Sequence, residues 1–161
     1  MRLKFRECRV SRLPAQSPAV SPASYRSAVP TIAELDAAGW PDEAGASTSF
    51  LVRRCLELRH KELAAFTVED LRIMLGQRIA VEVLLPLAVA VLLETPDAEG
   101  DYYPGDLLVV VARLPRTVWA DRPDEHRALA AAARSLLPHL PSTTHADLQP
   151  FIDSAPPPST R

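Results

Sequence analysis

Hydrophobic residues recur every three or four positions through the middle of the chain, which is the spacing of one face of an α-helix. The period begins after Pro30 and continues to about Leu137. Short polar stretches rich in proline, glycine, serine or aspartate interrupt it, as loops between helices do. The pattern predicts an all-α protein, a compact bundle of about five to six helices.

Hydroxyl residues mark the starts of the first three predicted helices. Residues 31–34, Thr-Ile-Ala-Glu, have the form of a capping box, and Gly39 is placed to end this short helix. A second helix runs from Ser49 to about His60. Thr67 caps a third, and Gly76 either ends it or allows a close turn. The residues expected on the apolar faces are Ile32 and Leu35, then Phe50, Leu51, Cys55 and Leu58, and then Leu71, Met74 and Leu75.

The fourth predicted helix, residues 81–94, is apolar nearly all round and contains Pro86, which should kink it. Such a segment suits the central helix of a bundle, although its β-branched residues leave a buried strand as an alternative. After a loop at 95–105, Pro104 suits the first turn of a fifth helix that reaches about Ala112. Trp119 anchors the connection to an alanine-rich sixth helix at 123–137.

Both ends of the chain lack a sustained helical period and are rich in serine, alanine and proline. Such segments cannot bury enough apolar surface to offset the entropy lost on ordering them. We therefore expect a disordered basic leader at 1–30, a helical domain at 31–140 and a disordered tail at 141–161. A start codon assigned too far upstream would also produce this leader, with Val29 as the natural start. The leader also fits the loose description of an organelle transit peptide.

Charge is divided unevenly between the leader and the rest of the chain. Residues 1–30 hold six basic residues and one acidic residue, a balance of +5, whereas residues 31–161 hold twelve basic and nineteen acidic, a balance of −7. An acidic domain repels nucleic acid and anionic membranes and suits a basic partner. The longest apolar stretch, residues 79–93, is shorter than the roughly 20 residues that a transmembrane helix needs.

Two cysteines do not make a disulfide framework, and the chain has no secretory signal, so we expect a cytoplasmic protein with a reduced, buried Cys55. No phosphate-binding glycine-rich loop or Gly-x-Ser-x-Gly motif is present. Residues 67–76 and the following helix outline a helix-turn-helix, but that second helix is too apolar to enter a DNA groove. The sequence predicts a binding protein that is not an enzyme and has no cofactor.

The most distinctive segment is 94–106, which holds five carboxylates, two tyrosines and no basic residue. One interpretation is a metal site, although the spacing does not match an EF-hand loop. A second is structural, with Asp101 capping the fifth helix and Asp106 in its first turn. A third, compatible with the second, is that acids around aromatic anchors steer and hold a basic partner. The partner-binding residues would then be Glu94, Asp97, Glu99, Asp101, Tyr102, Tyr103 and Asp106.

Three segments occur in an order that carries a family resemblance: FTVEDLRIMLGQ at 66–77, VLLPLA at 83–88 and AEGDYYPGDLL at 98–108. Over roughly residues 31–133 the chain resembles the immunity proteins of contact-dependent growth inhibition (CDI) systems. The resemblance implies a cytoplasmic helical protein that binds the toxin domain delivered by a neighbouring cell and blocks it by stoichiometric occlusion. Such toxins are commonly nucleases and often basic, which agrees with the acidic charge balance. The alternative function is a helical adaptor or regulatory subunit without a toxin partner.

Overall fold

The computed structural model of the chain describes residues 30–35 and 49–157. Within them the chain forms seven α-helices and no β-strand, which confirms the predicted all-α class. None of these helices is both long and apolar enough to cross a bilayer. The helices are α1 (Ile32–Leu35), α2 (Phe50–Arg59), α3 (Val68–Gly76), α4 (Val81–Glu94), α5 (Asp106–Ala112), α6 (Pro123–Leu136) and α7 (Ser142–Asp153), joined in part by the short 3-10 helices η2 (Leu63–Ala65), η3 (Arg116–Trp119) and η4 (Leu137–His139).

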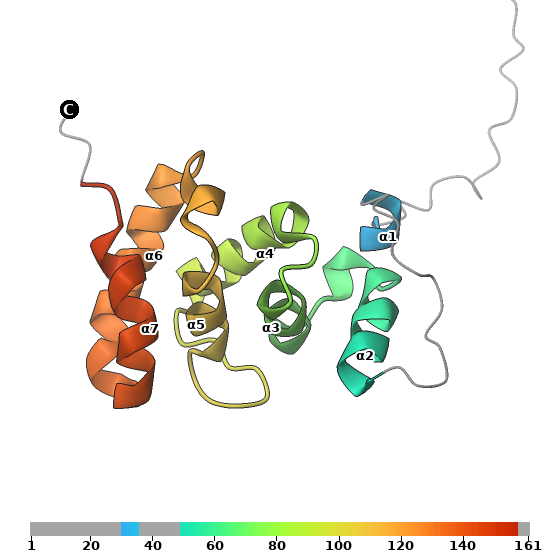
Figure 1. Cartoon of the computed structure of the whole chain (residues 1–161), viewed down its shortest axis with the longest axis horizontal. Helices are drawn as coiled ribbons and strands as arrows, with labels where there is room; N and C mark the ends of the chain where they lie inside the picture. Colours follow the sequence, from blue (N-terminus) through green and yellow to red (C-terminus); the bar gives the residue numbers. More distant parts are fainter. Residues whose placement is uncertain (1–29, 36–48, 158–161) are drawn as a thin grey trace, which may run out of the picture.

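The helices follow one another along the long axis of the molecule. Figure 1 shows α1 and α2 at one end and α6 and α7 at the other, with α3, α4 and α5 between them. The predicted leader, apart from Pro30, and Gly39 lie outside the described residues.

The predicted N-terminal caps of α1 and α3 are confirmed, and α2 begins after Ser49 as predicted. Glu34 accepts a hydrogen bond from the Thr31 N–H at 2.8 Å, and the Thr31 hydroxyl accepts one from the Glu34 N–H at 3.3 Å. The Ser49 hydroxyl caps α2, and Thr67 forms a second capping box with Asp70 at the start of α3. These reciprocal bonds satisfy amide groups that the first turn of a helix leaves without a partner.

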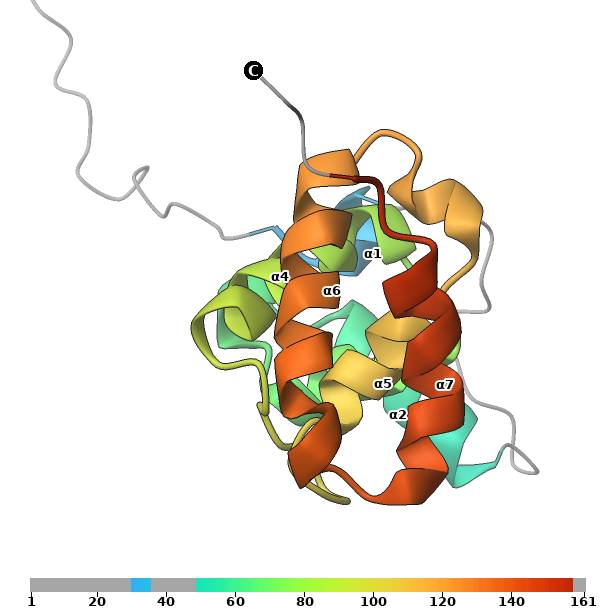
Figure 2. The same ribbon diagram turned by 90° about the vertical axis from the view of Figure 1, so that its left-hand side faces the viewer.

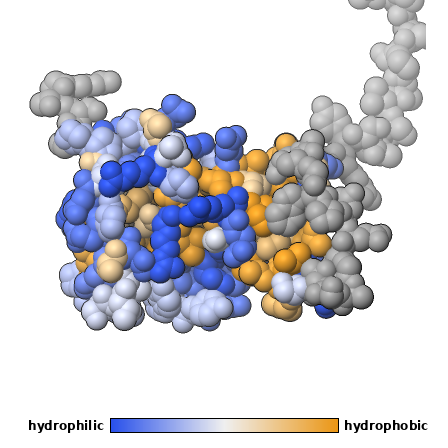
Figure 3. Space-filling model, in the orientation of Figure 1, coloured by the Kyte–Doolittle hydropathy of each residue, from blue (hydrophilic) through white to orange (hydrophobic). Residues whose placement is uncertain are grey.

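The predicted apolar face is correct for α3 and only partly correct for α1 and α2. Ile32, Cys55 and Leu58 are buried, and burial raises the pKa of the Cys55 thiol. Leu35 and the first turn of α2 are exposed, however, with Phe50 81% exposed. The buried residues of α2, which contacts α1 and α3, all lie in its later turns: Cys55, Leu56, Leu58 and Arg59. Figure 3 shows hydrophobic residues gathered on this side of the molecule, whereas the side formed by α5, α6 and α7 is largely hydrophilic.

The turn between α3 and α4 has a left-handed backbone at two residues that are not glycine. Arg78 (φ 57°) and Ala80 (φ 49°) both have positive φ angles. Around Arg78, the Ile79 N–H donates to the Met74 carbonyl and the Arg78 N–H donates to the Leu75 carbonyl, each at 2.9 Å. This is the Schellman pattern, in which glycine usually takes the left-handed position. Arg78 takes that position here, two residues after the predicted terminator Gly76.

Residues 81–94 form the predicted helix, and the strand alternative is wrong. α4 contacts α3, α5 and α6 and contains Pro86 as expected. It buries one face only, since Glu82, Pro86 and Leu93 are exposed, although the sequence is apolar nearly all round. Its buried residues are Leu84, Leu85, Ala88, Val89 and Leu92.

The fifth helix begins two residues later than predicted. Pro104 precedes it, and Gly105 is its N-terminal flanking residue with φ +85°, a left-handed conformation that turns the chain into α5. Asp106 lies in the first turn as predicted, but Asp101 does not cap this helix. The sixth helix, α6, matches its predicted start at Pro123 and ends one residue before the predicted Leu137.

The predicted tail at 141–161 is wrong in its first part, because α7 occupies Ser142–Asp153. Figure 2 shows α7 beside α6, and α7 also contacts α5. An aromatic cluster fixes this packing: the rings of Trp119, His126 and Phe151 have centroids 4.5–5.3 Å apart. The His126 Nε2–H donates to the Phe151 carbonyl at 3.0 Å. The helical domain therefore extends beyond residue 140.

Candidate functional site

The acidic segment predicted as a site forms the connection between α4 and α5, and we call residues 94–106 the acidic loop. It lies at one edge of the molecule (Figure 1). The Gly105 N–H donates to the Asp97 carbonyl at 3.0 Å, which closes the loop at its base. Ala98 is buried within the core. The acidic loop is therefore held to the fold at both ends and at one internal residue.

Asp106 organises the acidic loop from inside. It is 3% exposed, and its carboxylate accepts hydrogen bonds from the Gly100 N–H at 2.8 Å and the Tyr102 N–H at 3.3 Å. The Nε of Arg72 lies 3.7 Å from the same carboxylate and offsets its buried charge. Asp106 thus holds the loop in shape rather than offering its charge at the surface.

Helix α3 supplies the other support for the acidic loop. Glu69 accepts a hydrogen bond from the Asp101 N–H at 3.0 Å and two from Arg72, each at 2.6 Å. The hydrogen bonds from Arg72 hold the pKa of Glu69 below its usual range, although burial opposes this, and Glu69 in turn raises the pKa of Arg72. The Arg72 guanidinium also lies 4.4 Å from the centre of the Tyr102 ring, a cation–π distance.

Gly100 is the point at which the acidic loop comes closest to this support. A Cβ atom at position 100 would lie 2.5 Å from Glu69 Oε2 and 2.9 Å from Asp106 Oδ2. Real Cβ atoms do not approach that closely, so any larger residue at position 100 would require the two carboxylates or the loop backbone to shift.

The remaining predicted residues differ in exposure. The side chains of Glu94, Asp97, Glu99, Asp101 and Tyr102 are exposed, with Tyr102 70% exposed. Within the part of the chain that the structure describes, no ion pair engages the four exposed carboxylates. Tyr103 is half-buried and packs against the core. The loop therefore presents four free carboxylates and one tyrosine ring to solvent.

Sequence reasoning missed Glu69, Arg72 and Gly100. The spacing of Glu69 and Arg72 indicates only a helical ion pair, and nothing in the sequence links them to a loop about thirty residues away. The metal interpretation finds no support in residues 30–35 and 49–157, where no three His, Cys, Asp or Glu side chains are grouped to hold an ion.

A sequence profile of the CDI immunity proteins matches residues 34–129, more than half of the chain. The chain belongs to this family. The match runs from α1 into α6 and includes the whole acidic loop together with its support on α3, whereas α7 lies outside it. A search of curated proteins and a search of solved structures each found no match. CDI immunity proteins are generally non-enzymatic, so the relevant feature of such a protein is a binding surface rather than a set of catalytic groups.

Proposed function

We propose that this CDI immunity protein neutralises its toxin domain in the cytoplasm by stoichiometric binding, and that the acidic loop is part of the contact surface. Family membership is the observation that carries the proposal. Binding alone would account for neutralisation, so no catalytic step by this chain is required.

The construction of the acidic loop supports its part in binding. Asp106 and Glu69 fix the loop backbone at Gly100, Asp101 and Tyr102, so little conformational freedom remains to be lost on association. The free carboxylates would attract a basic partner and orient its approach. The exposed ring of Tyr102, supported from beneath by Arg72, has the character of an aromatic anchor.

The charge of residues 31–161 favours the same kind of partner. Residues 31–161 carry a balance of −7, and such a charge accelerates association with a positively charged protein. We also propose that the leader is dispensable for binding and that the functional domain includes α7, because α7 completes the core.

The first test is co-expression with the toxin domain encoded beside this chain. We expect relief of growth arrest and a 1:1 complex by isothermal titration calorimetry. Growth arrest that the chain cannot relieve, with no binding in the titration, would overturn the proposed function and leave the helical adaptor as the alternative.

The second test addresses the acidic loop itself. The triple variant Asp97→Asn, Glu99→Gln, Asp101→Asn should weaken toxin binding by about tenfold, since exposed ion pairs contribute up to roughly 1 kcal/mol each. The matched control is Glu57→Gln, Glu62→Gln, Asp153→Asn, which makes the same charge change outside the loop. Equal affinities for the two variants would show that the loop is not the contact surface.

A further inference from the structure

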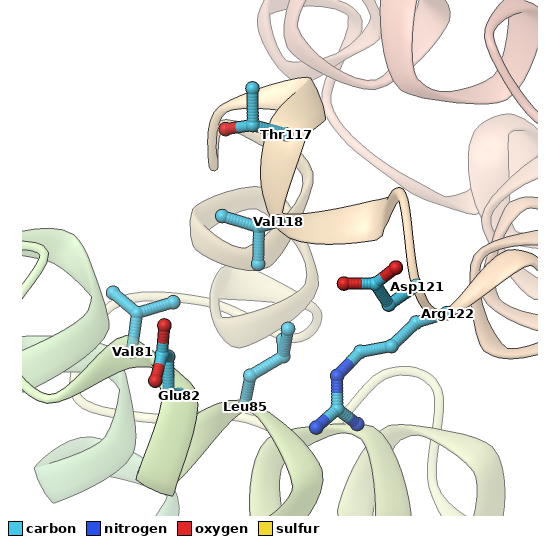
Figure 4. A pocket seen from close by; sticks show the side chains of 7 residues that line it. All are labelled: Val81, Glu82, Leu85, Thr117, Val118, Asp121 and Arg122. Atoms are coloured by element: carbon cyan, nitrogen blue, oxygen red, sulfur yellow. The ribbon is translucent and has the colours of Figure 1, made fainter.

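A groove at the opposite end of α4 from the acidic loop carries a second, independent set of features. Its lining comes from the first two turns of α4, from η3 and from the turn before α6, and its volume is about 720 Å³. Clefts that bind small molecules have volumes of about 300–1,000 Å³. The lining residues are Val81, Glu82, Leu85, Thr117, Val118, Asp121 and Arg122 (Figure 4).

The groove has an apolar floor and charged sides. Figure 4 shows Leu85 and Val118 in the middle, with Glu82 on one side and Asp121 and Arg122 on the other. Leu85 belongs to the buried core, while Val118 is half-buried and keeps part of its surface open to the groove. The floor is therefore fixed by the packing of the core.

The free charges in the groove are negative. Glu82 and Asp121 are exposed, and neither forms an ion pair or side-chain hydrogen bond with any residue that the structure describes. Arg122, in contrast, donates to the Glu125 carboxylate at 2.9 and 3.2 Å. Glu82 and Asp121 would repel an anion. A purely apolar segment would remove water from these two carboxylates without supplying hydrogen bonds or an opposite charge in its place.

We propose that this groove binds a segment of the toxin domain that inserts an arginine or lysine side chain. The aliphatic stem of such a side chain would cover the exposed parts of Val81 and Val118, above the buried Leu85, and its cation would reach Glu82 or Asp121. This inference rests on the proposed function, because it takes the toxin domain as the partner, but it concerns a surface that shares no residue with the acidic loop.

The test is titration of the toxin domain into the full chain and into the double variant Glu82→Gln, Asp121→Asn. The variant keeps the shape of the groove and removes its free charge, so we expect roughly a fivefold loss of affinity from two exposed ion pairs. The control Glu62→Gln, Asp153→Asn makes the same charge change elsewhere and should bind normally. Val118→Arg places a cation in the groove from the chain itself and should weaken binding at least as much.

Methyl NMR of Val81 and Val118 gives a readout that does not depend on a variant. Both residues should shift when the toxin domain is added in equimolar amount. If the double variant binds with unchanged affinity, the inference about the groove is wrong, whether or not the methyl signals shift. The proposed function still stands in that case if the acidic-loop variant binds weakly. Shifts that depend on the concentration of this chain alone would assign the groove to a second copy and also overturn it. A wild-type chain that does not bind the toxin domain would overturn both proposals.

Discussion

At the scale of single residues, a few buried carboxylates accept hydrogen bonds from backbone amides and so fix the local structure of the described residues. Asp106 orders the acidic loop, and Asp70 plays the same part at the start of α3. Asp70 is 1% exposed and accepts hydrogen bonds from Arg54, from Lys61 and from the Thr67 N–H. Each of these carboxylates fixes a junction between elements. Its replacement should therefore lower the free energy of unfolding through lost hydrogen bonds as well as through the lost charge.

Gly100→Ala should detach the acidic loop from α3. The added Cβ cannot occupy its position 2.5 Å from Glu69 Oε2, so either the Glu69–Arg72 pair or the loop backbone must move. We expect a loss of about 1–2 kcal/mol in the free energy of unfolding, measured by urea denaturation, and weaker binding to the toxin domain. Gly76→Ala is the matched control, because its Cβ would make only an ordinary contact with Val110 at 3.9 Å. Equal stability of the two variants would contradict this account.

Asp70→Asn should reduce stability at neutral pH and flatten its acid dependence. Burial alone would raise the pKa of Asp70, but hydrogen bonds from Lys61 and the Thr67 N–H outweigh it and hold the pKa below its usual range. A depressed pKa in the folded state stabilises the protein above the ordinary carboxyl pKa of about 4, and this contribution is lost as the pH falls through the folded-state value.

The measurement is the free energy of unfolding of wild type and Asp70→Asn from about pH 7 down to about pH 3. The wild type should exceed the variant by about 1–3 kcal/mol at pH 7, and the difference should shrink as the pH falls. The exposed Asp124→Asn serves as control and should show no such trend. A difference that grows toward acid would refute the assigned direction.

At the scale of elements, α7 shows how tertiary packing decides what local sequence leaves open. It follows Pro141, has no side-chain cap at its N-terminus and contains Pro150, all of which are typical of a loop. It is nevertheless helical because Leu148, Phe151 and Ile152 complete the core against α5 and α6. Short helices gain most of their stability from such packing.

Leu148→Ala should therefore destabilise the whole domain. Leu148 is fully buried at 0% exposure, and truncation of a buried leucine to alanine costs about 2–5 kcal/mol. Thermal and urea unfolding would measure the effect. Leu93→Ala, at an exposed position on α4, makes the same chemical change and should shift stability by less than about 0.5 kcal/mol. If both variants unfold alike, α7 is not part of the cooperative unit.

The elements that could be predicted from sequence are those whose signals are local. Hydroxyl caps and helical periodicity placed α2, α3, α4 and α6 within one or two residues. The exposed acids of the candidate site could also be predicted, because composition alone distinguishes residues 94–106. The contact of Asp101 with Glu69 could not be predicted, since the pair is 32 residues apart and depends on how α3 packs against α5.

At the scale of the whole molecule, the net charge of −2 is divided into +5 in residues 1–30 and −7 in residues 31–161. The acidic part predicts a dependence of binding on ionic strength. Charges steer association over distances that salt shortens to about 10 Å at 0.1 M. The association rate with the toxin domain should fall by about tenfold between low and high salt, while the dissociation rate changes much less. Stopped-flow fluorescence would measure both rates. The acidic-loop triple variant should show a shallower salt dependence, and a slope equal to that of the wild type would exclude the loop from steering.

Helix α4 has a consequence for partner discrimination. The groove residues Val81 and Glu82 lie at its first turn and Glu94 at its last, so its two ends are about 20 Å apart at 1.5 Å per residue. The packing of one face of α4 against α3, α5 and α6 keeps that separation fixed. A toxin domain that engages both ends must present its basic groups with matching spacing, and a related domain with equal charge but different spacing can satisfy only one end. If both proposed surfaces contact the toxin domain, partner selection depends on geometry as well as on charge.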